Sequence, residues 1–330
     1  MDKKIIFSGI QPTGYPQLGN YLGPMRNWVN LQDEYNCLYC VVDLHAITVR
    51  QAPAELRKNT RNLLSLLIAC GLDPEKNILY VQSHYSGHAE LSWILNCFTY
   101  MGELGRMTQY KEKSQKDEAN INAGLFTYPV LQAADILLFG THLVPVGEDQ
   151  RQHLELSRDV AIRFNNIYGD VFTVPEIHIP KIGAKIMSLS HPERKMSKSD
   201  DENSCISLLD TPEAVMRKFK RAVTDSETEI RYDVENKPGI SNLLEIYAIT
   251  CGMTINEAAA EFAGKNYGQL KTAVGEAVVG NIIQPVQARY NEISANADYL
   301  DSIMKTNAEK AAKIGEKILK KVKKKVGFVV

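Results

Sequence analysis

The sequence predicts an α/β protein in which a doubly wound parallel sheet is followed by a C-terminal all-helical domain. Apolar, β-rich stretches alternate with helical stretches up to about residue 165. Two of these stretches are almost continuously apolar, which is typical of strands covered by helices on both faces. Beyond residue 211 the strand pattern disappears and only helical patterns remain. We therefore expect one domain over residues 1–204 and a second over residues 205–330.

Each expected element of the first domain is defined by apolar periodicity and by Gly or Pro near its ends. The expected strands are residues 4–8, 38–43, 77–82 and 143–146, and residues 174–186 are extended. The expected helices are residues 19–31, 53–70, 88–101, 125–138 and 151–165. Ligands of such sheets bind beyond the carboxyl ends of the strands. Residues 7–11, 43–45 and 82–84 are therefore expected around one pocket.

The second domain is expected to be helical throughout, without an internal repeat. Its expected helices are residues 212–223, 239–249, one that starts at the capping box 254–257, 267–293 with a kink at Pro285, and 296–326. Residues 313–325 are dense in lysine. This segment is either a solvated helix face or a contact for RNA phosphates, and the sequence leaves open whether the last helix packs back on the sheet domain.

The composition is that of an ordinary soluble globular protein, with 44% hydrophobic and 23% charged residues in 330. A formal net charge of −1 excludes a globally basic nucleic-acid coat. No apolar run approaches the roughly 20 residues of a membrane span, and no signal peptide is evident. We therefore expect a cytoplasmic protein without a membrane partner.

Six cysteines are scattered along the chain, and Cys37 and Cys40 have C-x-x-C spacing. A metal or redox role for this pair must be weighed against a structural one. Residues three apart on a strand point to opposite faces, and no second Cys or His pair follows at zinc spacing. The interpretation that we favour is reduced, mostly buried thiols.

Two loops have the composition of a nucleotide site. Residues 10–20 join the first strand to the first helix, and unpaired N–H groups at such a junction favour an anion. Gly19 allows close approach of the backbone to a phosphate or ribose, whereas Asn20 is either an amide donor or a helix cap. Lys195 and Lys198 lie in a short hydroxyl-bearing run, which suits a loop that closes over a triphosphate.

A third candidate feature is the apolar helix at residues 125–138. Tyr128, Gln132 and Asp135 lie at i, i+4 and i+7, so they project from one helical face. A carboxylate among apolar neighbours costs several kcal/mol unless it is paired or accepts hydrogen bonds. Asp135 is therefore either a structural cap or ion pair, or an acceptor for a ligand donor. Residues 147–150 form a second polar junction between strand and helix.

Residues 17–20 (QLGN) and 195–199 (KMSKS) together resemble the HIGH and KMSKS signatures of the Rossmann-like class I aminoacyl-tRNA synthetases. Further blocks resemble the bacterial tryptophanyl-tRNA synthetase family. They are residues 7–14 (FSGIQPTG), 106–109 (RMTQ), 133–137 (AADIL), 144–150 (VPVGEDQ) and 237–244 (KPGISNLL). The blocks span about 240 residues in family order, which makes the set more specific than either signature alone.

The resemblance implies a cytoplasmic homodimer that uses ATP and Mg²⁺ to activate L-tryptophan and transfers it to tRNA(Trp). It implies ATP contacts at Gln11, Pro12, Thr13, Gly19, Asn20, Gly147, Glu148, Asp149, Ile186, Lys195, Met196, Ser197, Lys198 and Ser199. It implies an amino-acid pocket of Asp135, Phe7, His45, Tyr128, Gln132, Val144, Val146 and Gln150, with Asp135 accepting the indole N–H. The expected catalytic residues are Lys195, Lys198, Asn20 and Gln11, without protein ligands to a metal. Residues 205–330 would bind the anticodon.

This chemistry needs alignment and charge stabilisation rather than a covalent nucleophile. Two residues depart from the family pattern. Gln17 stands where Thr or His is usual, and Gln132 stands where many bacterial members have Met. With Tyr128 and Asp135, Gln132 resembles the tyrosine-binding helix of tyrosyl-tRNA synthetases. The alternatives are therefore a tyrosyl-tRNA synthetase, a nucleotidyl transferase without a tRNA substrate, and a non-charging paralogue that binds RNA.

Overall fold

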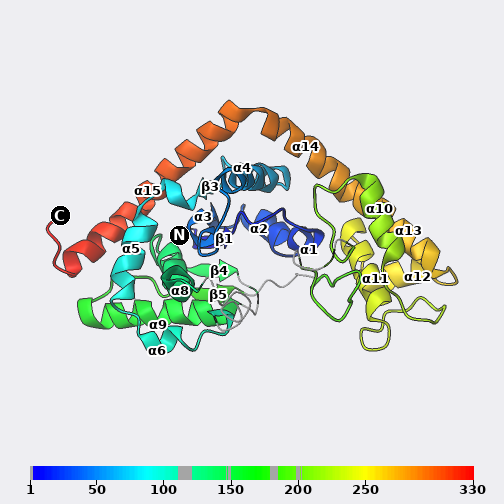
Figure 1. Ribbon diagram of the computed structural model, residues 1–330, viewed down its shortest axis with the longest axis horizontal. Coiled ribbons are helices and arrows are strands. Elements are labelled where there is room, and N and C mark those ends of the chain that lie inside the picture. Colours follow the sequence, from blue (N-terminus) through cyan, green and yellow to red (C-terminus); the bar gives the residue numbers. More distant parts are fainter. Residues whose placement is uncertain are drawn as a thin grey trace.

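The computed structural model contains a five-stranded parallel sheet (Figure 1). It describes residues 3–110, 121–145, 147, 150–178, 185–197, 201 and 203–330. The strands are β1 (Ile5–Ile10), β2 (Asn36–Val41), β3 (Ile78–Val81), β4 (Leu143–Pro145) and β5 (Glu176–His178). Their order in the sheet is β3-β2-β1-β4-β5, so the chain starts in the middle and winds outward in both directions. This arrangement confirms the expected doubly wound sheet.

Helices cover both faces of the sheet, as the apolar strands require. One face packs on α1 (Leu18–Asn20), the π-helical turn η1 (Tyr21–Met25), α2 (Arg26–Leu31) and α4 (Pro53–Ala69). The other face packs on α5 (Gly87–Asn96), α8 (Ala123–Leu137) and α9 (Arg151–Tyr168). The short elements α3 (Asp43–Ala46), η2 (Gln82–His84) and α6 (Met101–Leu104) follow β2, β3 and α5.

The pairing register fixes which face each strand residue occupies. Phe7 is the partner of Leu38, and both face the α5–α8–α9 side. On β2, Cys37 belongs to the core of one face and Cys40 to the core of the other. Both thiols are buried and unpaired by disulfide. Their opposite orientation confirms that this C-x-x-C pair cannot bind one metal ion together.

The second region contains helices alone among its described residues. They are α10 (Pro212–Arg221), α11 (Pro238–Cys251), α12 (Ile255–Glu261), α13 (Tyr267–Val278), the π-helical turn η5 (Val279–Ile283), α14 (Gln284–Ala295) and α15 (Ala297–Lys325). Thr211 caps α10 and Thr254 forms the expected capping box with Glu257. The chain is helical without a break over residues 267–295, and the π-helical turn ends just before Pro285, which lacks an amide donor. A kink at Pro285 stays a prediction.

Helices α14 and α15 form two sides of an arch that joins the helical region to the far side of the sheet (Figure 1). The C-terminal half of α15 packs against β3 and α5, so the last helix does return to the sheet domain. A Cβ on Gly315 would stand 2.6 Å from the Tyr85 ring, which explains a glycine at this crossing. Because β3 is an edge strand, α15 also covers an edge that would otherwise be open to pairing.

The domain boundary at residue 204 stays a prediction, because the two regions share contacts on both sides of it. Leu18 N donates to Ile206 O at 2.8 Å, and Leu208 N donates to Pro16 O at 3.1 Å. The segment after the boundary is thus paired with the loop that precedes α1. One apolar core runs from the β1–β2 face into the helices of the second region.

Candidate active site

Asp135 on α8 lies at the centre of a buried polar network at the carboxyl edge of the sheet. Its side chain is 1% exposed. Oδ2 accepts from His45 Nε2 at 2.9 Å, and Oδ1 accepts from His88 Nδ1 at 2.7 Å and from Gln82 Nε2 at 2.7 Å. Burial alone would raise the pKa of the Asp135 carboxyl, but the hydrogen bonds from both histidines outweigh it and lower that pKa. The group is therefore a stable carboxylate.

Further contacts hold two of these donors, His88 and Gln82, in place. His88 Nε2 lies 3.0 Å from the Tyr80 hydroxyl, which can donate to it once Nδ1 carries the proton shared with Asp135. Gln82 Oε1 accepts from Leu44 N at 3.1 Å, so this side chain joins the ends of β2 and β3. A carboxylate has about four acceptor positions, and three are used by the described residues. One position on Oδ2 therefore remains for a further donor.

The other expected pocket residues belong to several different elements. Phe7 stacks on Phe139 with ring centroids 5.8 Å apart, and Val144 is buried on β4. The Tyr128 ring lies edge-on to His45 at 6.2 Å, and its hydroxyl lies 2.9 Å from His153 Nε2. Gln132 and Gln150 are half-buried, and Val146 lies outside the described residues.

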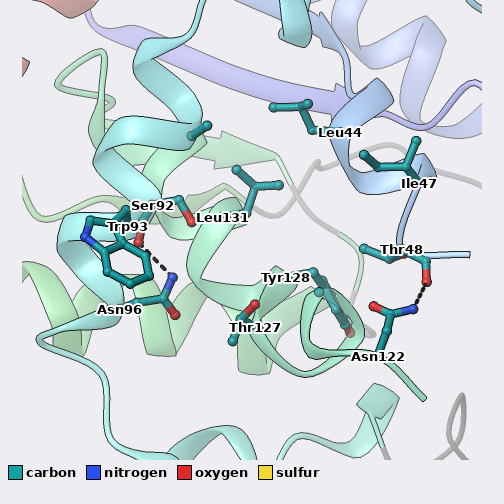
Figure 2. A pocket seen from close by; sticks show the side chains of 12 residues that line it. Leu44, Ile47, Thr48, Ser92, Trp93, Asn96, Asn122, Thr127, Tyr128 and Leu131 are labelled. Carbon is teal, nitrogen blue, oxygen red and sulfur yellow. Dashed lines mark hydrogen bonds between the residues drawn. The ribbon is translucent and has the colours of Figure 1, made fainter.

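Tyr128 also borders a pocket of about 390 Å³ on the outer side of α8 (Figure 2). This pocket opens between α3, α5 and the first turns of α8, and it is mostly apolar. Its lining comprises Leu44, Ile47, Thr48, Ala89, Ser92, Trp93, Asn96, Asn122, Gly124, Thr127, Tyr128 and Leu131. Asp135 is absent from this lining, so the pocket is a neighbour of the buried network rather than its mouth.

The first signature segment lies at the start of α1. Gln17 occupies the N-cap position, and its backbone N–H donates to Asn20 Oδ1 at 3.1 Å. The oxygen of Asn20 thus caps the helix, while its amide nitrogen remains a donor group. Along the preceding loop, Gln11 is half-buried, Pro12 is buried and Thr13 is exposed.

The second signature segment begins in a hairpin that contacts the first. Met196 N donates to Ile186 O at 3.0 Å, and Ser188 N donates to Arg194 O at 2.9 Å. Gly19 brings α1 against this hairpin, since a Cβ there would meet Ile186 Cβ at 3.5 Å. The side chains of Ile186 and Met196 are buried beneath the hairpin, whereas Lys195 is exposed. Ser197 is half-buried, and Lys198, Ser199, Glu148 and Asp149 lie outside the described residues.

Two side-chain amides fix this hairpin from opposite sides. Gln17 Nε2 donates to Met196 O at 2.6 Å, and Gln17 Oε1 is buried without a hydrogen-bond partner among the described residues. From the helical region, the Asn242 amide makes two bonds to Met187. It accepts from Met187 N at 2.9 Å and donates to Met187 O at 3.0 Å. This hairpin, residues 186–196, contains Lys195, and we call it the lysine-bearing hairpin. Hydrogen bonds connect it both to α1 and to α11.

Sequence reasoning missed His88 as a partner of Asp135, and it missed the contacts that Gln17 and Asn242 make. His88 is a lone histidine on an otherwise mostly apolar helix, and only the unpaired charge expected at Asp135 indicated that a partner must exist. Gln17 and Asn242 act through main-chain atoms of distant residues, which no local pattern reveals. Gln82 was expected near the pocket from the strand order alone.

A family model for class I tRNA synthetases (W and Y) matches residues 2–280. Tryptophanyl-tRNA synthetase from Mycoplasma pneumoniae is 34% identical, with a TM-score of 0.90 over 100% of this chain and 99% of that chain. The Campylobacter jejuni tryptophanyl-tRNA synthetase, solved with ADP and tryptophan, is 33% identical, with a TM-score of 0.85 over 98% and 100% of the two chains.

Tyrosyl-tRNA synthetase from Aeropyrum pernix shares the fold at 19% identity and a TM-score of 0.69, covering 92% of this chain and 89% of that chain. The bacterial enzymes are thus more similar in sequence and match the chain over nearly its full length. The chain therefore belongs to the class I tRNA synthetases of the tryptophan and tyrosine family, on the side of the tryptophanyl-tRNA synthetases.

Proposed function

We propose that this protein is a tryptophan–tRNA ligase that activates L-tryptophan with ATP and transfers it to the 3′ end of tRNA(Trp). The observation that carries the proposal is the contact between the two signature segments. Gln17 bonds to the backbone of Met196, so the start of α1 and the lysine-bearing hairpin face one site. That site lies beyond the carboxyl end of β1, where nucleotides bind in doubly wound sheets.

In this proposal Asp135 recognises the amino acid. Its remaining acceptor position on Oδ2 takes the indole N–H. The indole ring and the α-amino group are surrounded by the other residues of the proposed pocket: Phe7, His45, Tyr128, Gln132, Val144, Val146 and Gln150. The donors from His45, His88 and Gln82 hold the carboxylate in one orientation. Phenylalanine would leave the buried acceptor position unpaired, and such a mismatch is discriminated strongly.

The first reaction step forms a mixed anhydride. A carboxylate oxygen of tryptophan attacks the α-phosphorus of ATP, and the bond from that phosphorus to the bridging oxygen of pyrophosphate breaks. In the proposal Lys195 and Lys198 stabilise the departing pyrophosphate. The residues that hold the nucleotide are Gln11, Pro12, Thr13, Gly19, Asn20, Gly147, Glu148 and Asp149. In the second step the terminal adenosine hydroxyl attacks the acyl carbon and AMP leaves.

Mg²⁺ enters the proposal with the triphosphate. Among the described residues, no group of three or more His, Cys, Asp or Glu side chains is arranged to hold a metal ion. The phosphate oxygens would therefore supply most ligands of the ion, as is usual for Mg²⁺ bound with a nucleotide. The ion would neutralise the charge on the phosphates.

Exchange of pyrophosphate into ATP, with each of the twenty amino acids supplied in turn, tests the proposal. We expect exchange with tryptophan alone. Exchange with tyrosine would mean that the tyrosyl-like set of Tyr128, Gln132 and Asp135 decides specificity. An absence of exchange together with tRNA binding would favour the non-charging paralogue, and exchange without tRNA charging would favour a nucleotidyl transferase.

Lys198→Ala separates the leaving-group role from substrate binding. We expect it to slow adenylate formation far more than it weakens tryptophan binding, because the ammonium would act on charge that develops in the transition state. Equal losses in both quantities would contradict this role.

We also propose that the protein is a cytoplasmic homodimer. Trp93 is 72% exposed and Ile47 is 57% exposed, and they stand on opposite sides of the apolar pocket in Figure 2. Exposed apolar surface of this kind is typical of an interface. Separately, every described helix is too short or too polar to cross a bilayer. Sedimentation velocity should give a dimer for the wild type, a monomer for Trp93→Glu and a dimer for the control Ile167→Glu on α9.

A further inference from the structure

The C-terminal half of α15 carries a strongly basic surface. Residues 310–325 contain eight lysines and one glutamate, in a chain whose formal net charge is −1. Six of these lysines form what we call the lysine stripe: Lys310, Lys313, Lys317, Lys320, Lys321 and Lys324. At 3.6 residues per turn they fall within roughly 100° of the helix circumference and extend over about 21 Å of its length. All six are exposed.

The opposite face of the same helix is fully used in packing. Ala311, Gly315, Leu319 and Val322 are buried, and three of them belong to the core formed with α5, α8 and α9. A helix that lies on a membrane needs a free apolar face to insert into the acyl chains. This helix has already buried that face against its own protein, so a membrane surface is a poor match for the stripe.

The two remaining lysines of this segment have structural contacts. Lys323 Nζ lies 2.7 Å from Glu90 Oε1 on α5. Lys325 Nζ lies beside Gly169 at the end of α9, where a cation is favoured by the helix dipole. By contrast, no lysine of the stripe has an ion pair or hydrogen bond to any residue that the structure describes. The fold therefore has no evident use for the stripe itself.

The nearby acidic side chains do not neutralise the stripe. Glu309 and Glu316 fall at its flank on the helical wheel. Glu316 approaches Tyr85 on the sheet domain, where burial and this carboxylate raise the pKa of the phenol. Elsewhere in this protein some surface cations are paired, as Lys76 is with Asp33 and Arg61 with Asp301. An unpaired, single-sign row of this length is the electrostatic footprint of a polyanion site.

We propose that the lysine stripe binds the phosphate backbone of tRNA. This inference rests on the proposed function, which supplies the polyanion. Lysine ammonium groups contact phosphates as point charges, so the stripe would position the RNA without reading its bases. The stripe lies at the opposite end of the molecule from α10–α13 (Figure 1). It is therefore a separate contact from any anticodon contact made by those helices of the same chain.

The test compares two triple variants with the same loss of charge. The stripe variant is Lys313→Gln, Lys317→Gln and Lys320→Gln, and the control is Lys4→Gln, Arg57→Gln and Lys58→Gln, all exposed positions of the sheet domain. A third variant replaces the three stripe lysines by Arg. Each protein is assayed for binding of a tRNA(Trp) transcript between about 50 and 200 mM salt. Tryptophan-dependent pyrophosphate exchange is measured in parallel.

We expect the stripe variant to bind tRNA at least tenfold more weakly at about 0.1 M salt, with a salt slope smaller by about two to three. The Arg variant and the control should bind as the wild type does, and exchange should be unchanged in all of them. Equal tRNA binding by the stripe variant and the control would overturn the proposal. The proposal would also be overturned if the only defect of the stripe variant were weaker binding to vesicles of anionic lipid.

The result also separates this inference from the proposed function. If the wild type shows no exchange with tryptophan but the stripe variant still loses tRNA affinity, the proposed tRNA contact of the stripe is supported and the proposed ligase activity is refuted. If exchange is normal and the stripe variant binds tRNA as tightly as the wild type does, the proposed ligase activity is supported and the proposed tRNA contact of the stripe is refuted.

Discussion

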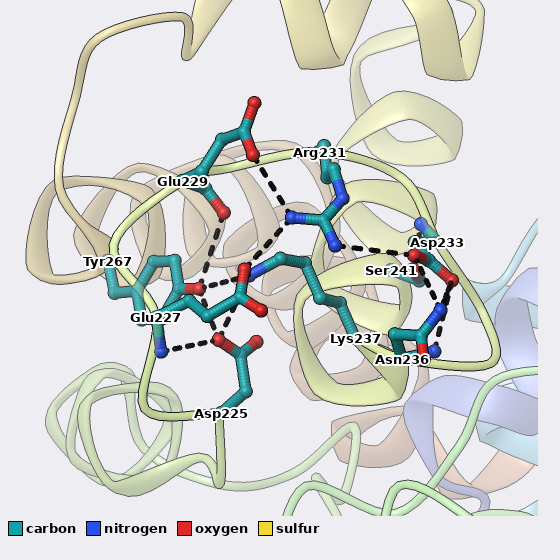
Figure 3. Close-up of polar contacts among 9 residues, drawn as sticks. All are labelled: Asp225, Glu227, Glu229, Arg231, Asp233, Asn236, Lys237, Ser241 and Tyr267. Atoms are coloured by element: carbon teal, nitrogen blue, oxygen red, sulfur yellow. Dashed lines mark hydrogen bonds and ion pairs between the residues drawn. The ribbon is translucent and has the colours of Figure 1, made fainter.

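Asp135 in the sheet domain and Lys237 in the helical region are both buried charged groups, but only one of them has all its hydrogen-bonding positions filled. Lys237 is 0% exposed at the start of α11 (Figure 3). Its three N–H donors are matched by Asp225 Oδ1 at 3.0 Å, Glu227 Oε2 at 2.8 Å and the Tyr267 hydroxyl at 2.8 Å. Asp135 has about four acceptor positions and uses three for described residues. All hydrogen-bond donors of the Lys237 ammonium thus have a partner, whereas one acceptor position of the Asp135 carboxylate has none among the described residues.

The two environments also differ in how they are assembled. The loop that surrounds Lys237 is continuous in sequence from Asp225 to Asp233, and Arg231 links three of its carboxylates. It is pressed against α11, where a Cβ on Gly239 would stand 2.2 Å from Val223 O. The partners of Asp135 instead come from three different elements at the carboxyl edge of the sheet. A saturated charge within a local loop indicates a structural role, whereas an unsaturated charge at a topological switch point indicates a ligand.

The largest expected effect is that of Lys237→Met on stability. Removing the ammonium takes away the cation that the half-buried Asp225 shares with the exposed Glu227, and it also breaks the bond to Tyr267. We expect the free energy of unfolding to fall by about 3 kcal/mol, because each hydrogen bond to a charged group is worth about 1.5–3 kcal/mol. Urea unfolding should show this loss, while exchange activity per folded molecule should stay near the wild-type value. The exposed control Lys220→Met should change the free energy of unfolding by no more than about 0.5 kcal/mol. An inactive but stable Lys237→Met protein would reverse the assignment of the two charges.

Asp135→Asn should have the opposite pattern. The amide keeps the shape but loses the charged acceptor, and a hydrogen bond to a charged group is worth about 1.5–3 kcal/mol. We expect kcat/KM for tryptophan in the exchange assay to fall about 10- to 100-fold, with weaker discrimination against phenylalanine and tyrosine. Asp159→Asn on the exposed face of α9 is the matched control. Unchanged selectivity in Asp135→Asn would remove this residue as the indole acceptor.

The same comparison explains which parts of the molecule were predictable. The strands and helices followed from periodicity, because a buried parallel strand is apolar on both faces and a helix repeats every 3.6 residues. Asp135 was evident from sequence because a carboxylate among Ala133, Ala134 and Ile136 needs compensation wherever it lies. The sequence could not say whether the compensation was complete, since His45, Gln82 and His88 become neighbours only through the strand order.

The contacts that position the lysine-bearing hairpin were not predictable. Gln17 departs from the Thr or His that is usual in the family, yet its amide bonds to a backbone carbonyl that any residue at position 196 would offer. Asn242 likewise contacts main-chain atoms of Met187. Such bonds depend on folded geometry rather than on the identity of the partner residue, so no sequence pattern marks them.

Acid should remove the stabilisation around both charges. Hydrogen bonds from Tyr267 and Lys237 outweigh burial and lower the pKa of Asp225, and the histidines lower that of Asp135. A carboxylate with a lowered pKa stabilises the fold above its unfolded pKa and loses that contribution as pH falls through the folded value. Stability should therefore decline below about pH 4. The decline should be shallower in Lys237→Met, as measured by urea unfolding at each pH, because Asp225 then lacks its cation.

The smallest expected effect is that of replacing Gln17, whose side-chain amide has a partner for its nitrogen but none among the described residues for its oxygen. Gln17→Met keeps the length of the side chain but removes the bond to Met196 O, which is worth about 1 kcal/mol. The same change removes Oε1, which is buried without a partner among the described residues, so the free energy of unfolding should change little. We expect kcat of exchange to fall about fivefold with KM for tryptophan unchanged, since the hairpin is no longer tied to α1. Gln284→Met on the exposed start of α14 is the control. Loss of stability without loss of kcat would show that Gln17 supports the fold and does not position the lysine-bearing hairpin.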